Sequence, residues 1–171
     1  MPMNADRLRE QQAPLKAQYK ENPASAVLTL RAKGRVSQDS VTCKLETGKP
    51  GVAAGLHPAT GGDGSAACSG DMLLEALVGC AGVTLAAVST SMGIELKDAT
   101  VAAEGELDFR GTLGVARDAP VGFTRIRLIF ALDTDAPAEK VQKLVELTER
   151  YCVVLQTLAK PPVIEVKRAG V

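Results

Sequence analysis

The segment over residues 71–94, DMLLEALVGCAGVTLAAVSTSMGI, most constrains the fold of this chain. Its apolar residues recur at helical spacing on nearly every side, which predicts a helix with no broad polar face. Ser69 or Asp71 can cap its start, and Gly93 supplies a stop. A helix of this kind must be shielded from water, so we expect it at the centre of the protein, covered all round.

Strand signals precede this helix. Residues 26–36 alternate well enough for a strand, with a turn from Lys33 to Ser40, and residues 41–47 form the returning strand of a hairpin. Residues 48–70 are rich in Gly, Pro and Ala. We expect them to form a long irregular loop, which in a compact domain is usually functional or mobile.

The second half of the chain predicts strands, then a helix. Residues 101–114 and 122–134 alternate as strands, and a helix capped by Thr134 or Asp135 then runs to the Pro161-Pro162 pair. Residues 163–169 read as a closing strand. The order of elements predicts an α+β fold.

Composition excludes several functions. Lys plus Arg equals Asp plus Glu at 20 each, so no net field attracts nucleic acid, and there is no Trp and little aromatic surface for base stacking. The helix over 71–94 carries Glu75 and several Ser and Thr, which favours a buried helix over a membrane span. Residues 1–24 are charged and lack the apolar core of a signal peptide, so we expect an N-terminal arm, one domain over 25–171 and a cytoplasmic location.

The four cysteines raise the question of redox chemistry. Cys80 lies midway along the first helix and Cys152 on the inward face of the second, so both point at one core and could approach disulfide distance. They are either small core residues or a reactive pair. A reactive thiol in apolar surroundings needs a cation, for which Arg31 and Arg35 are candidates, with Asp71 to orient the guanidinium.

The remaining thiols and the single histidine carry weaker signals. We expect Cys43 to be a packing residue and Cys68 an incidental or accessible thiol in the loop. One His, His57, with scattered Cys makes a zinc site improbable, and we expect no cofactor. The Gly61–Gly64 stretch follows no predicted strand and carries no Lys, so we interpret it as a flexible lid and not a phosphate loop.

Two motifs resemble those of the OsmC/Ohr family. They are SGDMLLEALVGCAG (69–82) and ERYCVVLQTLAKP (149–161), and the resemblance extends over about residues 25–169. It implies a thiol peroxidase acting on organic or lipid hydroperoxides, with Cys80 attacking and Cys152 resolving. It further implies an external dithiol reductant, such as a lipoyl protein, thioredoxin or a small thiol, and an intertwined homodimer.

The same resemblance assigns the activating cation. Lys-Gly-Arg35 resembles the Gly-Gly-Arg turn that holds the family's guanidinium, with Arg31 as the alternative. Asp71 stands where the family usually has Glu, and Val153 stands where it commonly has Pro.

Asp71 raises a geometric difficulty, because it precedes Cys80 by nine residues and a continuous helix would turn the two side chains to opposite sides. We therefore expect Asp71 to act from an irregular helix start or to serve a partner subunit's site.

The alternative function for the whole chain is that of a redox-silent protein of the same fold that binds an apolar small molecule.

Overall fold

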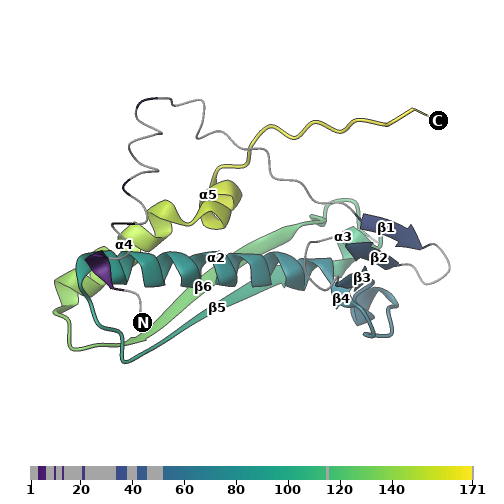
Figure 1. Ribbon diagram of the computed structural model, residues 1–171. Coiled ribbons are helices and arrows are strands. Elements are labelled where there is room, and N and C mark those ends of the chain that lie inside the picture. The colour runs from purple at the N-terminus through teal and green to yellow at the C-terminus, as the bar shows by residue number, and fades with distance from the viewer. Residues whose placement is uncertain are drawn as a thin grey trace.

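The computed structural model describes residues 4–6, 10, 13, 21, 34–37, 42–45, 52–114 and 116–170. Its main body is one long helix on a two-stranded sheet, with two shorter helices beside it (Figure 1). A small second sheet lies near the beginning of the long helix. This mixture of helices and small sheets is the α+β fold predicted above.

The long helix α2 (Ser69–Met92) packs along β5 (Asp98–Leu107), and side chains of β6 (Phe123–Asp133) pack against the core cluster that contains Leu77 and Ala81 of α2. The two strands are antiparallel, and alternate residues are exposed, as expected for a sheet with one covered face. The predicted helix and the second predicted strand are thus confirmed. α2 ends as expected at Gly93, whose φ of 65° is left-handed, but Cys68 occupies the N-cap position in place of Ser69 or Asp71.

The described residues cover only one side of α2, so they do not provide the full coverage that was expected. Leu77, Ala81 and Leu85 are buried, whereas the Val83 side is open and Val83 itself is 73% exposed. By length and composition alone α2 could cross a membrane. Its buried face against the sheet and helices is equally typical of an interior helix.

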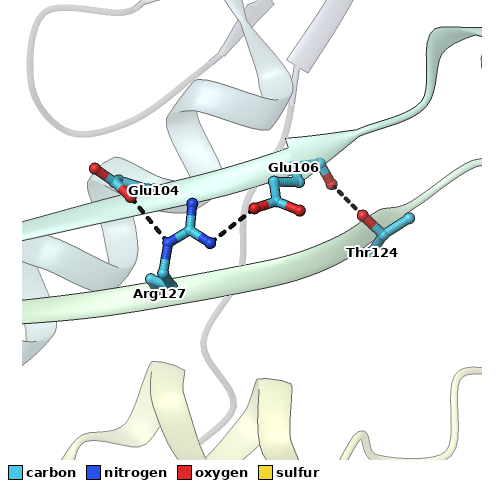
Figure 2. A network of polar contacts seen from close by, with 4 residues as sticks. All are labelled: Glu104, Glu106, Thr124 and Arg127. Carbon is cyan, nitrogen blue, oxygen red and sulfur yellow. Dashed lines mark hydrogen bonds and ion pairs between the residues drawn. The ribbon is translucent and has the colours of Figure 1, made fainter.

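The outer face of the β5–β6 sheet is polar. Arg127 lies between Glu104 and Glu106, at 3.0 and 2.7 Å, and the Thr124 hydroxyl donates to the Glu106 carbonyl (Figure 2). These exposed cross-strand pairs keep this face in water. One face of the sheet is therefore exposed to solvent, and α2 packs against the other face.

The second helical segment is broken where a continuous helix was predicted. α4 (Ala138–Tyr151) ends at Cys152, which is extended at φ −71° and ψ 106°, and α5 (Val153–Ala159) starts afresh. The break lets α5 pack Leu155 and Leu158 against the core that also contains Cys152. Neither predicted cap is used, because the Thr134 hydroxyl donates instead to the Glu95 carbonyl and Pro137 takes the N-cap position.

The predicted hairpin is present in the described residues, although the predicted strand residues 26–33 lie outside them. β1 (Gly34–Ser37) pairs with β2 (Thr42–Leu45), so residues expected in the turn form a strand. The region 48–70, expected to be irregular, contains β3 (Ala53–Gly55), the 3-10 helix η2 (Pro58–Thr60) and β4 (Ala67–Cys68). These short strands extend the hairpin into a four-stranded sheet, which stabilises a segment too glycine-rich to form strands alone.

The predicted strand over 101–114 stops at Leu107, and α3 (Phe109–Thr112) follows. Gly111 explains the change, because a Cβ there would lie 2.3 Å from the Pro120 carbonyl oxygen. This close approach of two chain segments requires glycine and turns the backbone away from the sheet.

The predicted closing strand over 163–169 is wrong. Residues 161–170 have no regular secondary structure and extend away from the helices (Figure 1). Val163 and Val166 are 93% and 94% exposed. A β-prone sequence still requires a strand edge to pair with, and this segment meets none in the described part of the chain.

Candidate active site

Cys80 and Cys152 meet in the core cluster formed by α2, α5 and the β5–β6 sheet. Cys80 sits midway along the helix and is partly exposed, whereas Cys152, between α4 and α5, is fully buried. They pack in one cluster with Leu77 and Ala81, both are free thiols, and each thiol shifts the pKa of the other. Residues 72 positions apart are thus brought together because two helices turn one apolar face each toward the same sheet.

The surroundings of Cys80 favour its thiolate. Burial raises the pKa of the Cys80 thiol, but the backbone N–H groups of Val154 and Val153 and the Cys152 thiol lower it by more. The Thr84 hydroxyl adds a smaller effect, since its single proton is shared with the Cys80 carbonyl 2.8 Å away. The net pKa of Cys80 lies below the ordinary value for cysteine.

Cys152 is shifted the other way. Burial raises the pKa of its thiol and the nearby Cys80 raises it further, with a partial offset from the Leu155 backbone N–H. The pair is therefore unequal: the partly exposed Cys80 ionises first, and the buried Cys152 keeps its proton and donates it toward Cys80. This is the order needed for one attacking and one resolving thiol.

Sequence reasoning missed the amide donors. It required a cation beside Cys80, yet the groups that lower its pKa in the described part of the chain are N–H, S–H and O–H donors. The helix break at Cys152 aims these amides, because N–H groups at a new helix start have no partner within the helix. Val153, in the position where the resemblance leads one to expect Pro, was the available signal: Val has an N–H and Pro has none.

Of Arg35, which is predicted to supply the guanidinium, the structure describes only the backbone. Arg35 lies on β1 opposite Lys44, and its side chain is outside the described residues, as is all of Arg31. Both therefore remain predictions.

Asp71 lies in the first turn of α2, which is helical from Ser69 onward. The irregular helix start proposed for it is therefore absent. Nine residues at about 100° each turn Asp71 and Cys80 to opposite sides, about 13 Å apart along the axis. Within this chain Asp71 does not reach Cys80.

Cys68 and His57 lie near the beginning of α2, away from the thiol pair. Cys68 is partly exposed, and His57 stacks on Phe109 with ring centroids 4.9 Å apart. Cys43 lies on β2 opposite Val36, and its side chain is outside the described residues. Across the described ranges, no group of three or more His, Cys, Asp or Glu could hold a metal ion.

The fold and sequence place the chain among known proteins. Solved structures with the same fold include an OsmC-like protein from Mycoplasma pneumoniae (13% identity, 78% of this chain and 89% of that one, TM-score 0.66). They also include an organic hydroperoxide resistance protein from Legionella pneumophila (16%, 78% and 91%, 0.60) and organic hydroperoxide resistance protein OhrB of Bacillus subtilis (18%, 78% and 93%, 0.54). No curated protein matches the sequence. The family model described as OsmC-like protein matches residues 62–167, well over half of the sequence, and the chain therefore belongs to the OsmC-like family.

Proposed function

We propose that this protein is a thiol peroxidase that reduces organic hydroperoxides with Cys80 and Cys152. The observation that carries the proposal is the unequal thiol pair: a partly exposed cysteine with a lowered pKa in contact with a buried cysteine with a raised one. Two structural relatives named organic hydroperoxide resistance proteins agree with this chemistry. Burial alone would raise the pKa of both thiols, so the lowered pKa of Cys80 reflects the donors around it.

The reaction runs in three balanced steps. The Cys80 thiolate attacks the distal oxygen of ROOH; the O–O bond breaks, Cys80 becomes a sulfenic acid, and the alkoxide takes a proton and leaves as ROH. The Cys152 thiol then attacks the sulfenic sulfur, forming the Cys80–Cys152 disulfide and releasing water. A dithiol reductant, itself oxidised to a disulfide, returns both thiols.

The protein's own donors stabilise charge in the first step. The amides of Val153 and Val154 hold the thiolate before attack. Arg35, from this chain or a partner, supplies a guanidinium for the developing alkoxide, and Asp71 orients it. A cytoplasmic location, where thiols are kept reduced, suits the need for an external dithiol.

A homodimer completes the proposal. Gly79 and Gly82 on α2 have nothing within 4 Å of where a Cβ would stand, so the described part of the chain gives no packing reason for two helix-weakening glycines. Val83 is exposed beside them, while the outer sheet face is charged. A second copy packing on the open face of α2 accounts for the two glycines and for the exposed Val83. It also allows Asp71 to serve the partner's Cys80.

The test is loss of cumene hydroperoxide in the presence of a dithiol, with wild type beside Cys80→Ser. The proposal expects turnover only with Cys80 present. A redox-silent protein that only binds apolar molecules would give equal, background rates for the two.

A further inference from the structure

A cavity lies near the start of α2, away from the thiol pair. Its volume is about 360 Å³, and apolar side chains dominate its walls: Leu56, Leu73, Leu107, Phe109, Val121 and Phe123. Cys68 contributes a thiol to the wall. Cys68 and Cys80 are twelve residues apart on or beside one continuous helix, which separates them by about 18 Å along its axis.

Two glycines shape this cavity. A Cβ on Gly105 would lie 2.4 Å from the Phe123 ring, so only glycine lets that ring lie across β5 and form a wall. At Gly70 a Cβ would lie 3.5 Å from Phe123 and 3.6 Å from the Cys68 sulfur, which is ordinary contact. A longer side chain at 70 would therefore project into the space that the cavity occupies.

The polar groups around the cavity favour a neutral hydrogen-bond acceptor over an anion. His57 accepts the Ala59 backbone N–H at Nδ1 (3.0 Å), so the neutral ring carries its proton on Nε2 and offers a donor. Its stacking on Phe109 fixes the ring. An adjoining cavity, which shares His57, is also lined by Asp71 and Glu106, whose carboxylates disfavour an anion.

We propose that this cavity is a binding site for a neutral apolar molecule that carries one hydrogen-bond-accepting oxygen, such as a medium-chain ketone. The apolar chain lies against the leucine and phenylalanine walls, and the oxygen accepts the His57 Nε2–H. Ligand pockets range from about 300 to 1,000 Å³, and this one, near the lower end, suits a chain of about ten carbons. The proposal is independent of the peroxidase proposal because it uses neither Cys80 nor Cys152.

Fluorescence offers a direct test, because the chain contains no Trp. Val121→Trp places a single reporter at the cavity, and Val166→Trp, in the exposed C-terminal segment, is its control. Titration with 2-decanone should give a saturable change in the first variant and none in the second. Decanoate, of similar length but anionic, should bind at least about tenfold more weakly, since none of the described residues that line the cavity is a lysine or arginine.

A second measurement uses the native thiol and does not depend on the reporter. In the wild-type protein 2-decanone should slow alkylation of Cys68, followed by peptide mass spectrometry, by about fivefold or more. Gly70→Leu, which fills the cavity, should abolish this protection, and Gly70→Ala, which fits, should keep it. Absence of a saturable signal with no protection, or decanoate binding as tightly as 2-decanone, would overturn the proposal whatever the peroxidase assay shows.

Discussion

The backbone N–H of Val153, the residue directly after Cys152, lowers the pKa of the Cys80 thiol. The same short stretch of chain thus supplies both the resolving thiol and a donor that stabilises the attacking thiolate. The helix break at Cys152 makes this geometry, since it ends α4 and starts α5 with its first amides turned toward α2.

Replacing Val153 with Pro should weaken Cys80 as a nucleophile. Pro removes one N–H but fits the first position of a helix, and the extended Cys152 backbone (φ −71°, ψ 106°) is the conformation preferred before Pro. A hydrogen bond to a charged group is worth about 1.5 kcal/mol or more, so iodoacetamide should react with Cys80 roughly tenfold more slowly at neutral pH. Val153→Ala keeps the N–H and is the control; equal slowing in both variants would contradict the assigned role.

The pKa values of the two thiols should lie on opposite sides of the pKa of an ordinary cysteine, which is about 8.5. In Cys152→Ser, which retains a donor, the alkylation rate of Cys80 should rise with pH and level off below that range, because the pKa of Cys80 is lowered. In Cys80→Ser, alkylation of Cys152 should begin only above that range, because burial raises its pKa. The reverse order of the two midpoints would refute the assignment of attacking and resolving thiols.

The open face of α2 should hold two copies together. Val83→Glu places a charge on this face, and we expect it to convert a wild-type dimer to a monomer in sedimentation velocity, with helical circular dichroism retained. Ile129→Glu, on the polar outer face of the sheet beside Arg127, is the matched control and should remain dimeric. A monomeric wild type, or a Val83→Glu variant that stays dimeric, would count against this interface.

Asp71 should act across that interface. Mixed dimers of Asp71→Ala and Cys80→Ser chains should regain part of the peroxidase activity that each variant lacks alone, because one of the two sites then has an intact Asp71 and an intact Cys80. Mixing that restores nothing, with heterodimers demonstrated by mass, would show that Asp71 does not serve a partner's site.

The buried core of this protein was predictable from periodicity. Apolar spacing identified α2, the strand that became β6 and the inward position of Cys152, since each depends on which residues must avoid water. Thr148 lies at helical spacing between Leu144 and Cys152, and it is buried with its hydroxyl donating to the Leu144 carbonyl.

Features that depend on other segments of chain were not predictable in the same way. The break at Cys152 has no Gly or Pro to mark it, and the donors to Cys80 are backbone amides, which every residue but Pro carries. The open face of α2 and the unpaired segment at 163–169 share one cause. Their sequences fit burial and pairing, but no described part of the same chain supplies the partner surface.

Peroxide turnover tests the central claim most directly. Wild type, Cys80→Ser and Cys152→Ser are each mixed with cumene hydroperoxide, with and without a dithiol, and peroxide loss is followed. We expect sustained turnover in wild type and none in Cys80→Ser. Cys152→Ser should consume about one peroxide per chain when no reductant is present, leaving a Cys80 sulfenic acid that dimedone traps. Peroxide loss in wild type that merely equals that in Cys80→Ser would contradict the account.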